Sequence, residues 1–195
     1  MRTKYTQEEA LCSYNRLGPV EPEGRHKYWF EDTPKEVKQE TEEERKIHNW
    51  LMNIYPSKIP FYIKVIHNKT CRLCGEYSIR KASRITLWSK TLIEESSYRN
   101  KPLETWFQST ALHEYAHCIH NQFTQFDNYT HGYVFKITLH ILCLIATKKG
   151  YIDAHDFNLS YPELRSNPFA EFVCKDMGFT IEEIEKMTEE YRSSH

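Results

Sequence analysis

The spacing of apolar and polar residues predicts a chain of mixed secondary structure. Apolar residues recur at helical spacing in five places, which predicts helices over residues 34–56, 102–123, 132–149, 168–177 and 180–193. Apolar and polar residues alternate in three short stretches instead, which predicts strands over residues 60–67, 76–80 and 84–88. Turn residues near Asn68 and Gly75 separate these strands. The pattern therefore predicts an α+β fold in which a small, mainly antiparallel sheet packs on helices.

Glycines, prolines and capping residues divide the chain into three predicted parts. Residues 1–33 contain several Gly and Pro turn signals and predict an irregular N-terminal arm. Residues 34–150 contain the predicted sheet and the main helices, and Gly150 suits the left-handed position after a helix. Residues 151–195 predict a C-terminal helical extension, whose last helix opens with the capping box of residues 180–183.

Composition indicates one folded domain that does not cross a membrane. The chain has 195 residues, of which 14% are aromatic, and its mean hydropathy is −0.71. Its longest apolar stretch, over residues 137–146, is shorter than the roughly 20 residues that span a bilayer. The N-terminus has no apolar run of the signal-peptide type. We therefore expect a cytoplasmic protein without a membrane partner, with its six cysteines reduced.

Charge is balanced overall but unevenly distributed. The net charge is −1, from 26 Lys and Arg against 27 Asp and Glu. Residues 58–101 contain ten basic residues against three acidic ones, whereas residues 31–45 and 171–192 each contain seven acidic against three basic. A basic surface can bind nucleic-acid phosphates, although basic residues on a small sheet also serve as solvated edge protection. Nucleic acid is therefore one candidate partner.

The helix predicted over residues 102–123 contains the motif with the clearest chemistry, His113-Glu114-Tyr115-Ala116-His117. Two imidazoles four residues apart lie on one face of a helix and can bind a single Zn²⁺, with Glu114 beside the metal. An apolar stripe lies about a quarter turn away and allows the helix to pack on a core. The stripe consists of Leu112, Ala116, Ile119 and Phe123. The alternative is a pair of histidines without a metal, whose ring nitrogens form hydrogen bonds with neighbouring groups on a polar helix face.

A catalytic zinc ion normally takes three protein ligands, so a third ligand is expected. The metzincin pattern is excluded, because it requires Gly and His where this chain has His120 and Phe123. His131 follows the helix after a turn and can return to the metal. Glu171 or Glu163, near a later helix, are the other candidates.

Several elements occur in the order of a known family. A packing helix and a strand with Ile63-Lys64-Val65 precede a turn at Gly75 and a strand with Ile85-Thr86-Leu87. The HExxH motif then precedes His131-Gly132-Tyr133-Val134-Phe135, an HGxxF pattern. In these features residues 59–135 resemble the SprT-like, Spartan-type zinc metalloprotease domain.

The resemblance covers roughly residues 40–150. It implies a zincin-like fold with HExxH on the central helix, and Glu114 as the catalytic base. It also implies a Zn²⁺ cofactor with three ligands, His113, His117 and His131. Many members append a zinc ribbon with paired Cys-x-x-Cys motifs, whereas this tail contains only Cys174.

The expected activity is that of a zinc metallopeptidase acting on a protein or peptide substrate. Zinc would activate a water molecule, and Glu114 would take its proton and pass it to the leaving amine. One alternative is a non-proteolytic, zinc-stabilised adaptor or nucleic-acid-binding module that uses the basic segment. A further alternative is a zincin whose third ligand is Glu171.

Four other features have two interpretations each. Tyr129 or Tyr133 can supply an oxyanion donor, although packing is the commoner role for tyrosine. His120 lies about one turn beyond His117 and can contact the metal ligands or a substrate. A solvent-facing position is the commoner one for such a histidine. Cys71 and Cys74 form a Cys-x-x-Cys spacing that suits half a zinc site or a redox pair. No second pair completes it, so turn and strand thiols are the simpler interpretation.

Overall fold

A computed structural model describes residues 40–78, 83–100, 102–121, 131–152, 162–167 and 169–193. These residues form six helices and a three-stranded sheet, which confirms the predicted α+β class. The predicted arm over residues 1–33 lies outside the described residues. In chain order the elements are α3 (Glu42–Ile54), β1 (Phe61–Ile66), β2 (Gly75–Ser78), β3 (Ser83–Trp88), α4 (Ser89–Arg99), α5 (Leu103–His120), α6 (Tyr133–Lys148), α7 (Ala170–Asp176) and α8 (Ile181–Ser193).

The sheet is mixed, so the prediction of a mainly antiparallel sheet was wrong. The strand order is β1-β3-β2, with β3 parallel to β1 and antiparallel to β2. The three strands were predicted at nearly these positions. Alternation within a strand shows which side chains are buried, but it carries no information on which strands are neighbours. The central place of β3, and with it the parallel pair, was therefore missed.

Helix α3 is fixed to the edge strand β1 by carboxylates. It begins at Glu42, later than Pro34, because Thr41 caps it in a capping box with Glu44. The Glu44 carboxylate also accepts a hydrogen bond from the Val65 backbone N–H at 2.9 Å. Glu40 accepts one from the Ile63 backbone N–H at 2.8 Å. These bonds connect the start of α3 to the outer edge of β1.

Two helices occupy the region between β3 and the HExxH motif, where only one was predicted. Helix α4 was missed because its buried face includes Thr91 and Ser96 beside Leu92, so its apolar pattern is weak. It ends at Arg99 and is followed by the C-cap residue Asn100, which adopts a left-handed conformation with φ of 51°. Helix α5 then begins directly after Pro102, as predicted.

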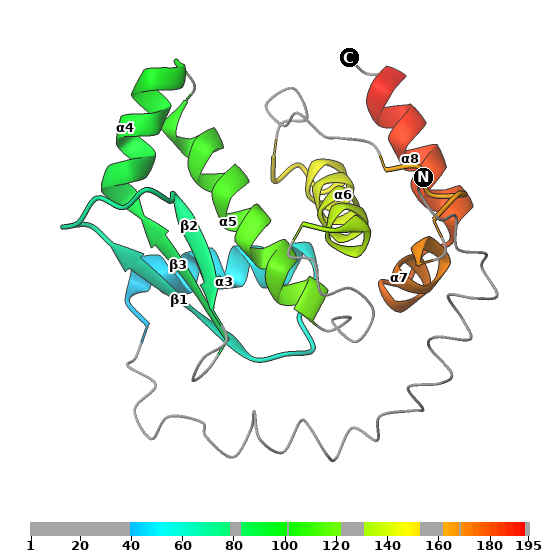
Figure 1. Cartoon of the computed structure of the whole chain (residues 1–195), viewed down its shortest axis with the longest axis horizontal. Coiled ribbons are helices and arrows are strands. Elements are labelled where there is room, and N and C mark those ends of the chain that lie inside the picture. Colours follow the sequence, from blue (N-terminus) through cyan, green and yellow to red (C-terminus); the bar gives the residue numbers. More distant parts are fainter. Residues whose placement is uncertain are drawn as a thin grey trace, which may run out of the picture.

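Helix α5 is the centre of the molecule. It lies between the sheet on one side and α6 on the other, while α3 packs against β1 (Figure 1). Its apolar stripe is confirmed, because Leu112, Ala116 and Ile119 are fully buried. Phe123 of the predicted stripe lies outside the described residues. The hydroxyl group of buried Tyr115 donates to the Tyr55 carbonyl, which joins α5 to the end of α3.

The C-terminal helices pack on the far side of α6, as Figure 1 shows. Gly150 has φ of +69° and follows α6 as the predicted left-handed residue. Thr180 and Glu183 form the predicted capping box of α8, with hydrogen bonds of 2.8 and 3.1 Å. Within the described ranges, no helix is both long enough and apolar enough to cross a bilayer.

Candidate metal centre

The HExxH motif lies in the C-terminal half of α5. Burial of the apolar stripe fixes the rotation of this helix, so His113 and His117 project together from another face, one turn apart. Both imidazoles are partly buried. Their ring centroids are 5.0 Å apart.

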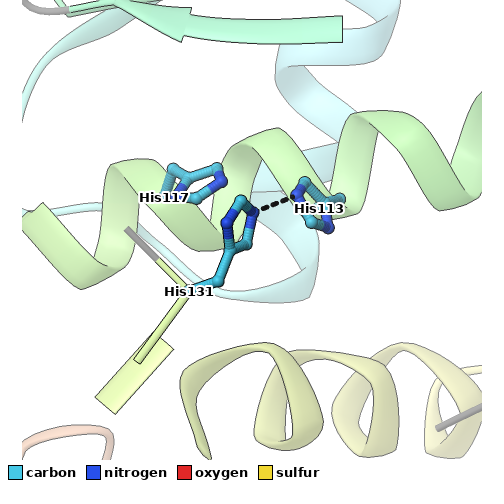
Figure 2. A group of neighbouring side chains, drawn as sticks. All are labelled: His113, His117 and His131. Atoms are coloured by element: carbon cyan, nitrogen blue, oxygen red, sulfur yellow. Dashed lines mark hydrogen bonds between the residues drawn. The ribbon is translucent and has the colours of Figure 1, made fainter. Parts of the chain in front are cut away.

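His131 joins the two helical histidines from the segment that leads into α6. It lies directly before Gly132, the N-cap residue of α6. Its Nε2 atom is 3.1 Å from Nε2 of His113. Figure 2 marks this contact with a dashed line. One nitrogen from each of the three rings lies within 4.8 Å of the others. Nitrogens bound to one tetrahedral zinc ion at about 2.0–2.1 Å are about 3.3 Å apart, so small side-chain rotations are sufficient. This group can therefore hold a metal ion.

Phe135, in the first turn of α6, packs against all three histidines. Its ring stacks on His117, with centroids 4.2 Å apart and an interplanar angle of 26°. It meets His131 and His113 edge to face at 4.9 and 5.1 Å. Because Phe135 is only 3% exposed, the imidazoles rest on a buried aromatic surface.

The local environment keeps the two helical imidazoles neutral. Burial, followed by the nearby His131, lowers the pKa of His113 to about 4. Burial, together with the neighbouring imidazoles, lowers the pKa of His117 to about 3. A neutral imidazole has a free lone pair, so both side chains are in the form that binds a metal at neutral pH.

Glu114 points from α5 toward strand β2 and is 8% exposed. Burial raises the pKa of Glu114 to about 7. The nearby backbone N–H of Tyr77 opposes this shift in pKa, and the charge of Glu76 adds to it. A carboxyl group whose pKa lies near neutrality is suited to general-base catalysis.

The structure does not bring the alternative ligands to this group. Glu163 and Glu171 are exposed, and Glu163 accepts a hydrogen bond from Ser166 at 3.0 Å. Among the residues that the structure describes, the one cluster able to hold a metal consists of His113, His117 and His131.

Of the remaining candidates, His120 and Tyr133 have surroundings other than those favoured from the sequence. His120 is 4% exposed, so the solvent-facing interpretation was wrong; its ring lies 6.1 Å from that of Phe135. Tyr133 is 63% exposed and is therefore not a packing residue. Tyr129 lies outside the described residues. Cys71 and Cys74 are partly buried free thiols outside the metal-capable group.

The basic segment is partly neutralised by acidic neighbours. Lys58 contacts Asp176 at 2.7 Å, and Arg99 contacts Glu95 at 3.0 Å. Lys64 pairs with the buried carboxylate of Glu44. These contacts reduce the positive field that a nucleic acid would meet on this part of the surface.

Two neighbours of the site were not assigned a role from the sequence. Phe135 was noticed only as part of the HGxxF pattern, and Gly75 only as a turn residue. The spacing of HGxxF, which places an aromatic residue one helical turn after His131, was a usable signal for Phe135. No comparable signal exists for Gly75, because its contact with α5 joins distant parts of the sequence.

Comparison with protein-family models, with curated proteins and with solved structures gave no match to this chain.

Proposed function

We propose that this protein is a zinc-dependent metallopeptidase of the HExxH type, related to the SprT-like domains that it resembles. One observation carries the proposal: three imidazoles converge within 4.8 Å while a buried carboxyl group follows the first of them on the same helix. Three protein ligands that leave a fourth position open are typical of catalytic zinc sites.

In this proposal His113, His117 and His131 hold the metal ion. When bound, zinc lowers the pKa of a water molecule to about 7 and polarises a carbonyl group. Glu114 would take the proton of the attacking water as the water oxygen adds to the scissile carbonyl carbon, and would give that proton to the amine as the C–N bond breaks. Burial around Glu114 excludes competing water and strengthens its electrostatic interactions.

The replacement of Glu114 by Gln tests this function. Wild-type protein is expected to contain about one zinc per chain and to cleave fluorescein-labelled casein, with loss of cleavage on chelation. Glu114→Gln is expected to retain the zinc and to lose about 10²–10⁴-fold in rate, because the amide cannot accept the proton.

Glu104→Gln is the matched control. Glu104 lies in the first turn of the same helix, is exposed and accepts a hydrogen bond from Gln108. This variant should cleave casein at the wild-type rate. Equal rates for Glu114→Gln and wild type, with and without added DNA, would eliminate the proposed mechanism. The DNA arm also tests the basic segment as a nucleic-acid surface.

A further inference from the structure

Strand β2 packs tightly against α5 at its first residue, Gly75. A Cβ atom placed at Gly75 would lie 2.7 Å from Cγ of Glu114 and 2.8 Å from Cγ2 of Thr110. It would also lie 3.0 Å from a carboxylate oxygen of Glu114. Carbon atoms in contact normally stand about 3.5–4.0 Å apart, so no larger residue fits here without displacing its neighbours.

The hydrogen-bond pattern of β2 directs a second contact to the same carboxylate. The Trp88 N–H bonds to the Cys74 carbonyl, and the register pairs Gly75 with Leu87. In an antiparallel pair, successive residues of a strand alternate between bonding to the partner strand and pointing away from it. Because Cys74 bonds to β3, the N–H groups of Gly75 and Tyr77 point away from β3. The outward N–H of Tyr77 lies on the side of Glu114 and favours its charged carboxylate.

From these two contacts we infer that Gly75 is a positioning residue for Glu114. Its missing side chain lets the β2 backbone close over the Glu114 side chain, and this packing holds the carboxylate in its place. The catalytic consequence rests on the proposed function, whereas the contact itself does not.

A side chain at Gly75 would displace Glu114 rather than the metal ligands. The clash is with Cγ, in the middle of a buried side chain, so the carboxylate cannot keep its place. A displacement of about 1 Å can cost a catalytic group on the order of 10² in rate. No atom of His113, His117 or His131 is among the three nearest neighbours of the added Cβ.

The first test is Gly75→Ala, with zinc content and turnover measured at saturating labelled casein. Turnover is expected to fall by about tenfold or more, with zinc content and KM unchanged. Thr110→Ser removes the second clashing atom and keeps the hydroxyl group that donates to the Trp106 carbonyl at 2.9 Å. Gly75→Ala combined with Thr110→Ser should therefore regain part of the turnover.

Ser78→Ala, in the same strand, is the control and should leave turnover unchanged. Unchanged turnover in Gly75→Ala would overturn the inference. A loss of turnover that accompanies a loss of zinc and is not relieved by Thr110→Ser would also overturn it. Such a loss would show a general structural effect of the substitution.

A double-mutant cycle tests the contact without any activity measurement. Gly75→Ala should lower the urea midpoint of unfolding in the wild-type background. It should lower the midpoint less in Glu114→Ala, which lacks the clashing Cγ and carboxylate oxygen and keeps only the contact with Cγ2 of Thr110. An equal shift in both backgrounds would show that Gly75 does not bear on Glu114. Absence of casein cleavage by the wild type would contradict the proposed function. The cycle would still test the contact between Gly75 and Glu114, because it needs no activity measurement.

Discussion

At the residue scale, one phenylalanine organises the candidate metal centre. Phe135 stacks on His117 and touches the rings of His113 and His131, and it is buried beneath them. Groups that orient metal ligands commonly affect metal affinity by about 10–100-fold. We propose this role for Phe135, because its ring contacts three imidazoles at once.

The replacement Phe135→Leu tests that role. Zinc affinity, measured by competition with a chromogenic chelator, should fall by about tenfold or more, since leucine cannot stack on the imidazoles. Ile145→Val, a buried change near the other end of the same helix, should leave the affinity at the wild-type value. Wild-type affinity in Phe135→Leu would show that the histidines are oriented by other contacts.

The histidines themselves were predictable, and their surroundings were not. His113 and His117 lie one turn apart in any helix, and the spaced HGxxF pattern indicated His131. The stacking of Phe135 and the closure of Gly75 over Glu114 depend on how α6 and β2 approach α5. That approach is set by packing of the whole core, which local spacing does not encode.

At the element scale, helix α3 and strand β1 are joined through the buried carboxylate of Glu44. It accepts bonds from the backbone N–H groups of Thr41 and Val65 and from the Lys64 ammonium group at 2.8–3.1 Å. Burial alone would raise the pKa of Glu44, but these hydrogen bonds outweigh it and hold the pKa below its usual value. Its charged form therefore stabilises the fold.

Glu44→Gln should lower the free energy of unfolding at pH 7 by about 1–3 kcal/mol, because charge-assisted hydrogen bonds are lost. Since the folded pKa lies below the unfolded value, this contribution is present above the unfolded pKa, near 4.5, and disappears as the pH falls through the folded pKa. Urea unfolding at a series of pH values measures it.

The control for this prediction is Glu42→Gln, in the same helical turn. Glu42 forms an exposed ion pair with Lys46. Its replacement should change stability by less than about 0.5 kcal/mol at any pH. A pH-independent difference between Glu44→Gln and wild type would contradict the assigned charge.

The elements were predicted unevenly for physical reasons. Helix α5 was found because its buried stripe is apolar, whereas α4 was missed because it buries Thr91 and Ser96. The strands were located by alternation, but their order depends on contacts between β1 and β3 that the pattern does not contain. Local patterns thus predicted the elements better than their assembly.

At the scale of the whole molecule, the three histidines connect its two halves. His113 and His117 belong to α5, which packs on the sheet, while His131 leads into α6, which packs on α7 and α8. A metal ion bound by all three histidines would fix these two parts to each other. Metal binding should therefore contribute to global stability.

Removal of the metal should lower the melting temperature. Free zinc at about 1,000 times its Kd stabilises the folded state by about 4 kcal/mol, which corresponds to roughly 10 °C for a chain of this size. Thermal unfolding with and without EDTA measures the difference. His131→Ala should abolish the response, and Glu171→Ala, at an exposed position of α7, should retain it. The reverse pattern would assign the third ligand to Glu171.

Carboxylates lie along both outer edges of the described sheet. Glu40 and Glu44 accept hydrogen bonds from outward N–H groups of β1, and Glu114 lies beside the outward N–H of Tyr77 on β2. Unpaired edge amides are the usual template for aggregation between chains, so this arrangement protects the protein from strand addition by another copy. A Gln at position 114 keeps an oxygen acceptor for that amide, whereas Ala at the same position leaves it open to intermolecular pairing.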